Sequence, residues 1–508
     1  MWQASNVYAI CGFAAIGGGL FGFDISSMSG VLGTEAYRQY FDHPTVYRQG
    51  GITASMPVGS LLGALSSSFI ADRFSRKVSL QIACIFWIIG ATFQCAANGV
   101  ALLCVGRIVA GYCVGICSAI VPVYQSEIAP KEIRGRVVSL QQWAITWGIL
   151  IQYFIQYGAA EGTDGGPTDP EQSTAAFRIP WGVQMVPGVI LFLGLFFCPY
   201  SPRWLASKDR WEEAMKVLVH VHGKGNPDDP KVLAQYQEIE EALRFEPLTN
   251  PDYIVYIMQG AGLGNPLLTA SVQYIINVAL TLPAIIFLDK WGRRKPLIIG
   301  SFFMMTWLFI SGALQQAYGE PNTDETRTTE NSDVTWIVYE QRPVSIAIVS
   351  CSYLFVATFA TTWGPVSWTY PAEIFPSKVR AKAVSLATAT NWFFNTVLAF
   401  AVPPLLWNIN YNMYYIFATF NALACIHMFL LAPETKGFTL EEMDDVFNSG
   451  IPAWRTHVKT SRLDELAVEI EAAKGKGVEP AVGNGEYVPG EKTVQTTTGS
   501  HEDNTRAV

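Results

Sequence analysis

Eleven long apolar runs constrain what this chain can fold into more than any other feature of its sequence. Several reach the ~20 residues that a helix needs to cross the ~30 Å hydrocarbon core of a bilayer. Only 15% of the residues are charged, whereas soluble domains carry about 25%. One large soluble domain would have to bury many such helices on every side. The runs therefore predict an all-α membrane protein.

Two of these runs are joined by a short polar hinge, Glu127-Ile-Ala-Pro-Lys-Glu-Ile-Arg-Gly-Arg136. A later hinge, Tyr370–Lys382, repeats the order Glu, Pro, Arg between apolar runs. A second motif is also repeated, because Asp72-Arg-Phe-Ser-Arg-Lys77 matches Asp289-Lys-Trp-Gly-Arg-Arg294. Two repeated halves with a substrate site between them are typical of secondary transporters.

Composition divides the chain into four parts. We expect an N-terminal membrane bundle, a cytoplasmic helical linker domain, a C-terminal membrane bundle and a disordered cytoplasmic tail, at residues 1–198, 199–247, 248–449 and 450–508. Lys and Arg concentrate in alternate loops, which the positive-inside rule places in the cytoplasm together with both termini. The net charge of −8 argues against a nucleic-acid partner. The cysteines and histidines show no metal or disulfide spacing, so we expect no metal and no cofactor.

Five segments carry a family resemblance: GGGLFGFDISSMSG (17–30), PVYQSEIAPKEIRGRVVSLQQWAITWGI (122–149), WGPVSWTYPAEIFP (363–376), NWFFN (391–395) and PETKG (433–437). Together they resemble the sugar-porter branch of the major facilitator superfamily, and their sequences are close to those of fungal hexose transporters. The likeness covers nearly all of residues 7–450. It implies two six-helix bundles with an intracellular helical domain between them, and transport of a glucose-like hexose by alternating access and proton symport. We expect a monomer in the plasma membrane.

The resemblance implies a sugar site on the facing helices of the two bundles. Its residues are Gln142, Ile149, Asn277, Gly364, Trp368, Asn391 and Trp392. Amides can both donate and accept hydrogen bonds, and aromatic rings offer apolar faces to a sugar. We expect Asn391 and Trp392 to open the next-to-last span. A lone amide could instead be an interhelical hydrogen bond worth ~1 kcal/mol, but three amides at matched motif positions favour sugar binding.

Asp24 lies inside an apolar run, where a carboxylate is a functional candidate by default. The resemblance places Asp24 at the proton acceptor of proton-coupled porters, near Arg107. The alternative is an aspartate close enough to the outer surface to reach water.

The charged hinges have a different expected role. The resemblance implies a salt-bridge network that closes the cytoplasmic side and breaks when the transporter opens inward. Its expected members are Arg73, Glu127, Arg134, Arg136, Arg293, Glu373 and Arg380. Positive-inside anchoring alone would explain the arginines but not the glutamates.

The chain departs from the family pattern most severely before Asn277, where the family has a complete seventh helix. Here Phe245–Asp252 runs straight into Tyr253–Gly260. The apolar core of the only candidate, 248–264, is far shorter than the ~17–25 residues of a span. We therefore expect a truncated seventh helix and poor transport. A deletion in the transcript and a misplaced exon boundary explain the gap equally well.

Two other functions fit the sequence less well. A membrane sugar sensor would signal through its tail, but the tail after Gly450 is short and holds no repeated motif. A membrane enzyme would need catalytic groups, and the sequence holds no Ser/His/Asp set, metal spacing or phosphate loop. We therefore expect a transporter and not an enzyme.

Overall fold

The computed structural model of the chain describes residues 6–130, 132–163, 171–223, 225–226, 229, 232–233, 235–236, 266–321, 336–338, 341–375, 380–436, 443 and 453–455. Nearly all of these residues are helical, apart from turns and one short antiparallel ladder between β1 (Glu320–Pro321) and β2 (Trp336–Ile337). The expected remnant of the seventh helix at 248–264 lies outside the described residues, as does all of the expected tail except 453–455.

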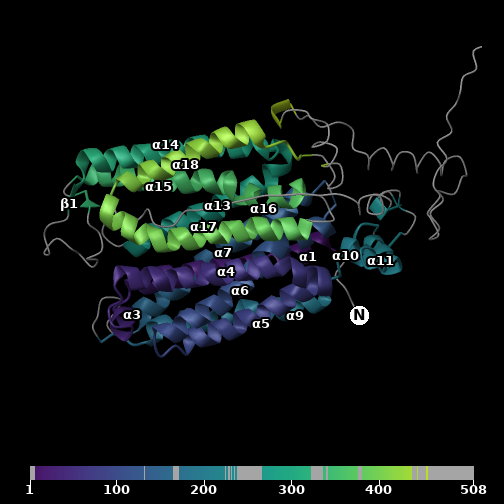
Figure 1. The fold of residues 1–508 in the computed structure, drawn as a ribbon, viewed down its shortest axis with the longest axis horizontal. Helices are drawn as coiled ribbons and strands as arrows, with labels where there is room; N and C mark the ends of the chain where they lie inside the picture. Colours follow the sequence, from purple (N-terminus) through teal and green to yellow (C-terminus); the bar gives the residue numbers. More distant parts are fainter. Residues whose placement is uncertain are drawn as a thin grey trace, which may run out of the picture.

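Two helical bundles lie side by side (Figure 1). The first contains α1 (Val7–Ala14), α2 (Ile16–Ser29), η1 (Val31–Gly33), α3 (Glu35–Tyr40), α4 (Val46–Phe74), α5 (Arg76–Cys95), α6 (Val100–Ile128), α7 (Arg134–Gly162), α8 (Ala175–Val183), α9 (Met185–Gly194) and η2 (Leu195–Phe197). The second contains α13 (Pro266–Trp291), α14 (Arg294–Tyr318), α15 (Arg342–Thr361), α16 (Trp363–Ile374), α17 (Arg380–Ile409) and α18 (Asn412–Leu431).

The two ends of the bundles differ. Two short helices, α10 (Pro202–Ala206) and α11 (Trp211–Val221), lie beyond one end, which we call the α11 end (Figure 1). The helix α3 and the strand β1 lie at the opposite end, called the α3 end. A short helix after the second bundle, η5 (Ala453–Arg455), contacts α18.

The apolar runs form helices of membrane length. Within the described part of the chain, nine segments are long and apolar enough to cross a bilayer. The long helices α7 and α17, which are not among these nine, complete the eleven expected runs. The expected all-α fold with membrane-length helices is therefore confirmed.

Glycines let α4 and α6 approach at backbone distance. Gly59 and Gly63 on α4 face the backbone of α6, while Gly111 and Gly115 on α6 face the backbone of α4. A Cβ atom at any of these positions would collide with a backbone carbonyl of the other helix. Helices in lipid gain no hydrophobic drive toward one another, so close packing between small residues is a main source of their association.

The two bundles meet along two helix pairs, α4 with α17 and α7 with α13. The repeated motifs show that α4 corresponds to α13, and α7 to α17. The two contacts are therefore equivalent to each other by the internal repeat. The helix α16 also contacts α7 and α6, so it brings its residues to the same interface.

Three expected spans are interrupted or shifted. The first is divided into α1 and α2 at Ala15, and the span expected at 344–370 is divided into α15 and α16 at Thr362, just before Gly364. Asn391 does not open its span, as expected from the sequence, but lies deep inside α17. That expectation was wrong because α17 begins at Arg380, before the apolar part of the run.

Ser75 joins α4 to α5 with a φ of 96°, a left-handed conformation that favours glycine. The equivalent residue of the second half is Gly292, with a φ of 84°. The Ser75 hydroxyl accepts a hydrogen bond from the Val78 amide and so caps α5. The serine therefore strains the turn and partly offsets that cost with a helix cap.

Candidate functional site

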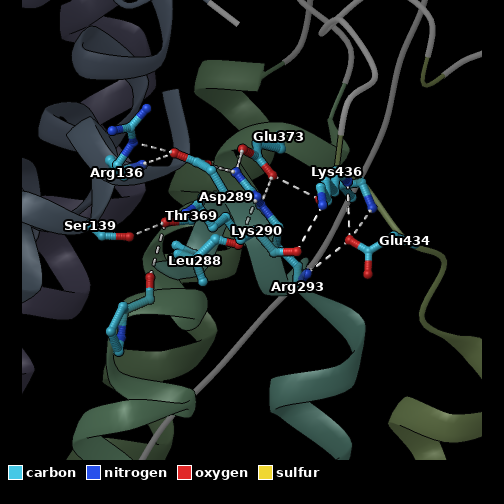
Figure 2. A network of polar contacts seen from close by, with 12 residues as sticks. Arg136, Ser139, Leu288, Asp289, Lys290, Arg293, Thr369, Glu373, Glu434 and Lys436 are labelled. Carbon is cyan, nitrogen blue, oxygen red and sulfur yellow. Dashed lines mark hydrogen bonds and ion pairs between the residues drawn. The ribbon is translucent and has the colours of Figure 1, made fainter. Parts of the chain in front are cut away.

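Arg293 is the centre of a charged network at the α11 end of the second bundle (Figure 2). Its guanidinium donates to both oxygens of Glu373, at 2.7 and 2.8 Å, and to Asp289 Oδ1 at 3.0 Å. Thr435 Oγ1 donates to Glu373 Oε2 at 2.8 Å. Burial would lower the pKa of Arg293, but the Glu373 and Asp289 carboxylates raise it above its ordinary value. A buried, bidentate pair of this kind keeps its charges because its hydrogen bonds are satisfied.

The first bundle holds an equivalent network. Arg76 forms an ion pair with Glu127 at 3.1 Å and another with Asp72 at 3.2 Å. The Ser201 hydroxyl donates to Glu127 Oε2, as Thr435 does to Glu373. The two networks therefore use the same residue types at repeated positions.

A pair of tyrosines supports the networks, and the sequence analysis missed it. Tyr124 donates to the Pro199 carbonyl at 2.6 Å, and Tyr370 donates to the Pro433 carbonyl at 3.0 Å. Each tyrosine precedes the network glutamate by three residues. This shared spacing was visible in the sequence and could have identified both.

Arg73 was expected in the network, but the structure places Arg76 there instead. The Arg73 side chain is exposed, and its guanidinium lies 5.8 Å from the centroid of the Phe74 ring. Arg76 follows Asp72 by four residues, as Arg293 follows Asp289, and this spacing puts each pair on one helix face.

Asp289 also links the two bundles. Its Oδ2 atom accepts from Arg136 Nε at 2.9 Å and from the Arg136 amide at 3.2 Å, while Oδ1 holds Arg293 (Figure 2). A Cβ atom at Gly135 would collide with the Arg293 and Asp289 side chains, so the glycine permits this approach. The Arg136 side chain is 38% exposed, and pairs this exposed contribute only about 0–1 kcal/mol.

Two further arginines, Arg134 and Arg380, are buried at the starts of α7 and α17. Arg380 interacts electrostatically with Glu127 and Arg134 of the opposite bundle. The structure therefore brings together six of the seven residues expected at this end, and Arg73 is the exception.

Gln142 and Trp368 meet between the bundles. Trp368 Nε1 donates to Gln142 Oε1 at 2.8 Å, and both side chains are buried. Ile149 packs in the same apolar cluster as Trp368. A Cβ atom at Gly364 would lie 3.3 Å from Gln142 Nε2, so this glycine leaves room beside the amide.

Aromatic rings surround this pair. The Phe21 ring lies 6.4 Å from Trp368 and 5.0 Å from Trp392, between centroids. Trp392 Nε1 donates across the interface to Ser118 Oγ at 3.0 Å. The sequence analysis missed Phe21, since its contacts depend on how α2 crosses α16 and α17.

The two expected asparagines lie differently. Asn391 is buried, and its Oδ1 atom accepts from Asn395 Nδ2 at 2.9 Å. Asn277 is half-buried on α13, where its backbone carbonyl accepts a hydrogen bond from Thr281 Oγ1 at 2.7 Å. Tyr274, one turn earlier on α13, packs against the cluster that holds Trp368. The contacts found among the described residues do not bring Asn277 itself into that cluster.

Asp24 is completely buried on α2, so it does not reach water at the surface. Its Oδ2 atom lies 3.8 Å from Arg107 Nη2, and Arg107 Nε donates to the Ile52 carbonyl at 3.2 Å. Neither Asp24 oxygen accepts a hydrogen bond from the described residues. The distant Arg107 cation and the buried Gln94 side chain both act on this carboxylate. Movement of Arg107 therefore changes the cost of its charge.

The sequence profile of the family described as "Sugar (and other) transporter" matches residues 10–251 and 252–447. The chain belongs to this sugar transporter family. It is 61% identical to the MFS glucose transporter mfs1 of Aspergillus flavus, over 92% of this chain and 95% of that protein. It is 43% identical to the high-affinity glucose transporter of Kluyveromyces lactis, over 89% and 87%.

Solved structures agree with this membership of the sugar transporter family. The MFS proton:xylose symporter XylE bound to 6-bromo-6-deoxy-D-glucose superposes with a TM-score of 0.70 at 26% identity, over 88% of this chain and 100% of that one. The inward open conformation of XylE from E. coli superposes with a TM-score of 0.62 at 27% identity, over 87% and 99%. The chain is thus a multi-pass membrane protein with the major facilitator fold.

This sugar transporter lacks residues that its relatives have. The alignment with the A. flavus protein spans 506 positions but includes only 92% of the 508 residues of this chain. The alignment with the K. lactis protein spans 492 positions but includes only 89% of them. Each relative therefore has residues where this chain has none. The family match itself is divided between residues 251 and 252.

Replacing Arg76 should destabilise the protein far more than replacing Arg73. Arg76→Ala leaves Glu127 buried without its ion-pair partner, which costs about 3–5 kcal/mol. Arg73→Ala removes an exposed side chain and should change stability by less than about 0.5 kcal/mol. Thermal unfolding of the two purified variants in detergent would test this. Equal unfolding temperatures would contradict the place of Arg76 in the network.

Proposed function

We propose that this chain moves a glucose-like hexose across the plasma membrane by alternating access, coupled to proton symport. The observation that carries the proposal is the Gln142–Trp368 pair, which places an amide and an indole between two bundles related by an internal repeat. The names of its relatives support glucose as the substrate class, and the fold that it shares with a proton:xylose symporter supports proton coupling.

The α11 end faces the cytoplasm in this proposal, with both termini. Lys and Arg concentrate in the loops at this end, at 73–77, 131–136 and 290–295, and such loops stay inside. The charged network is then a closed cytoplasmic gate. The lower TM-score with the inward open symporter supports this interpretation.

Cytoplasmic termini predict that tags on either terminus bind antibody only after sealed cells are permeabilised.

Sugar binding exchanges hydrogen bonds in this site. Without sugar, Gln142 Oε1 is satisfied by the Trp368 indole. A sugar hydroxyl can donate to that oxygen and accept from Nε2, while the indole offers an apolar face for the ring. The Nε2 contact comes in addition to this exchange, so sugar binding gains from the Gln142 amide.

Gln142→Ala should weaken glucose binding about tenfold. The loss of one hydrogen bond and the stranding of its buried partner cost ~1–3 kcal/mol, and 1.4 kcal/mol corresponds to a factor of ten. Equilibrium binding of labelled glucose to the purified protein measures this. Gln141→Ala is the matched control, because Gln141 packs against Gly18 on α2. If Gln142, Asn277, Trp368 and Asn391 can all be replaced by alanine with normal binding, the sugar site lies elsewhere.

We expect this chain to transport glucose slowly, because it lacks part of the seventh helix. The division of the family match between residues 251 and 252 supports a gap at this place, and the extra residues of the relatives are consistent with it. The resemblance to sugar porters implies that this helix carries sugar-binding amides. A chain that binds glucose without carrying it would be a membrane sugar sensor, which is the second candidate function.

Restoring the A. flavus segment after Phe245 should raise glucose uptake at least tenfold. Each missing buried hydrogen bond to the sugar costs ~1–3 kcal/mol. The two chains are compared at equal surface expression in a host without hexose carriers. Equal uptake would show that the segment is dispensable. The transcript across the codons for 245–253 distinguishes a true deletion from a misplaced exon boundary.

Asp24→Asn in the restored chain should abolish uphill accumulation of sugar but preserve sugar exchange. The carboxylate would carry the proton, and the movement of Arg107 away from it would favour protonation. Accumulation at acidic and neutral external pH, measured beside exchange, separates the two steps. Asp42→Asn, at an exposed carboxylate, is the control. If Asp24→Asn still accumulates sugar in a way that depends on pH, this role of Asp24 is excluded.

A further inference from the structure

Two hydroxyl pairs join the bundles near the charged network. Ser139 Oγ on α7 lies 2.9 Å from Thr369 Oγ1 on α16. Ser67 Oγ on α4 lies 2.7 Å from Ser385 Oγ on α17. All four side chains are buried, and each pair joins one residue of the first bundle to one of the second. Hydrogen bonds of this kind associate helices in membranes.

The serines on α7 and α17 are related by the internal repeat, although their partners lie on helices that the repeat does not relate, α16 and α4. Ser139 follows Arg134 by five residues in RGRVVS, and Ser385 follows Arg380 by five residues in RAKAVS. Each repeat thus places one serine against a hydroxyl of the opposite bundle. Both halves therefore contribute one hydroxyl from the start of an equivalent helix to the interface between the bundles.

Ser139 also occupies a particular level on α7. Residues three apart on a helix share a face, so Arg136, Ser139 and Gln142 follow one another along it. Arg136 binds Asp289, Ser139 binds Thr369, and Gln142 binds Trp368, the residue beside Thr369. Figure 2 shows the hydroxyl pair beside the charged network. The pair therefore lies between the ion pairs and the candidate sugar site.

Three of these four hydroxyls have a second acceptor in their own helix. Thr369 Oγ1 donates to the Pro365 carbonyl at 3.0 Å, so it accepts from Ser139. Ser67 and Ser385 can each donate to a carbonyl one turn earlier, those of Ala64 and Ala381. When the bundles separate, Thr369, Ser67 and Ser385 keep a partner. Opening therefore avoids most of the penalty of a stranded buried donor.

We propose that the pairs Ser139–Thr369 and Ser67–Ser385, the hydroxyl clasps, form an uncharged second layer of the cytoplasmic gate. Ser139 is a positioning residue that holds Gln142 in register with the Arg136–Asp289 ion pair. The gate opens only when both clasps separate. This inference rests on the alternating access proposed above and adds to it the residues that couple the sugar level to the charged level.

The test compares Ser139→Ala, Ser385→Ala and the double variant of the full chain in nanodiscs by hydrogen–deuterium exchange. Each loss should shift the equilibrium toward the inward-open state about threefold, and both together about tenfold. Uptake of deuterium should rise at the α11 ends of α7 and α17 and fall at the α3 ends of α4 and α13. Ser60→Ala, which removes a buried hydroxyl bonded within α4, should leave both ends unchanged.

The opposite movement of the two ends separates a gate from a packing contact. A weakened fold would raise uptake at both ends, and this result, or no change at either end, would overturn the proposal. Ser139→Thr with Ser385→Thr keeps both hydroxyls and should restore the original pattern. Hydrogen–deuterium exchange does not require transport. A result that contradicts the hydroxyl clasps is therefore distinguishable from an absence of glucose uptake.

Discussion

The carboxylate of Asp289 joins the ion pairs within the second bundle to the contact between the two bundles. One oxygen holds Arg293 within the second bundle, and the other holds Arg136 of the first. The contact within the bundle is buried together with Glu373, whereas Arg136 is partly exposed. Removing a partner from a buried pair is costly, but separating an exposed pair is cheap. The ion pairs therefore hold the second bundle together more firmly than the Arg136 pair holds it to the first.

The internal repeat gives both halves charged contacts with the opposite bundle, but the residues that make these contacts differ. Arg136 corresponds by repeat to Lys382, which is exposed. The second bundle instead reaches the first through Arg380, whose buried charge interacts with Glu127. One half contributes a half-exposed ion pair and the other a buried charge. The two halves therefore contribute unlike charged contacts to the joint between the bundles.

The sequence predicted the helices well, because apolar runs of bilayer length have few other ways to satisfy their backbones. It also predicted Glu127 and Glu373, since the hinge that contains the glutamate occurs in both halves. It chose Arg73 over Arg76 because both fit the motif by type, and only the spacing from Asp72 separates them. Phe21 and the Ser139–Thr369 contact could not be predicted, because they depend on the angles at which helices cross. No periodicity along one chain specifies those angles.

The proposed gap before α13 bears on the proposed sugar site. The linker and the 290–295 loop both carry inside charge, so an even number of crossings must separate them. The helix α13 supplies one crossing, and the sequence leaves only 248–264 for the other. Yet the contacts that join the bundles, α4 with α17 and α7 with α13 and α16, use none of those residues. The proposed gate is built on these described contacts, and the proposed sugar site is the part of the molecule that a shortened seventh helix would affect.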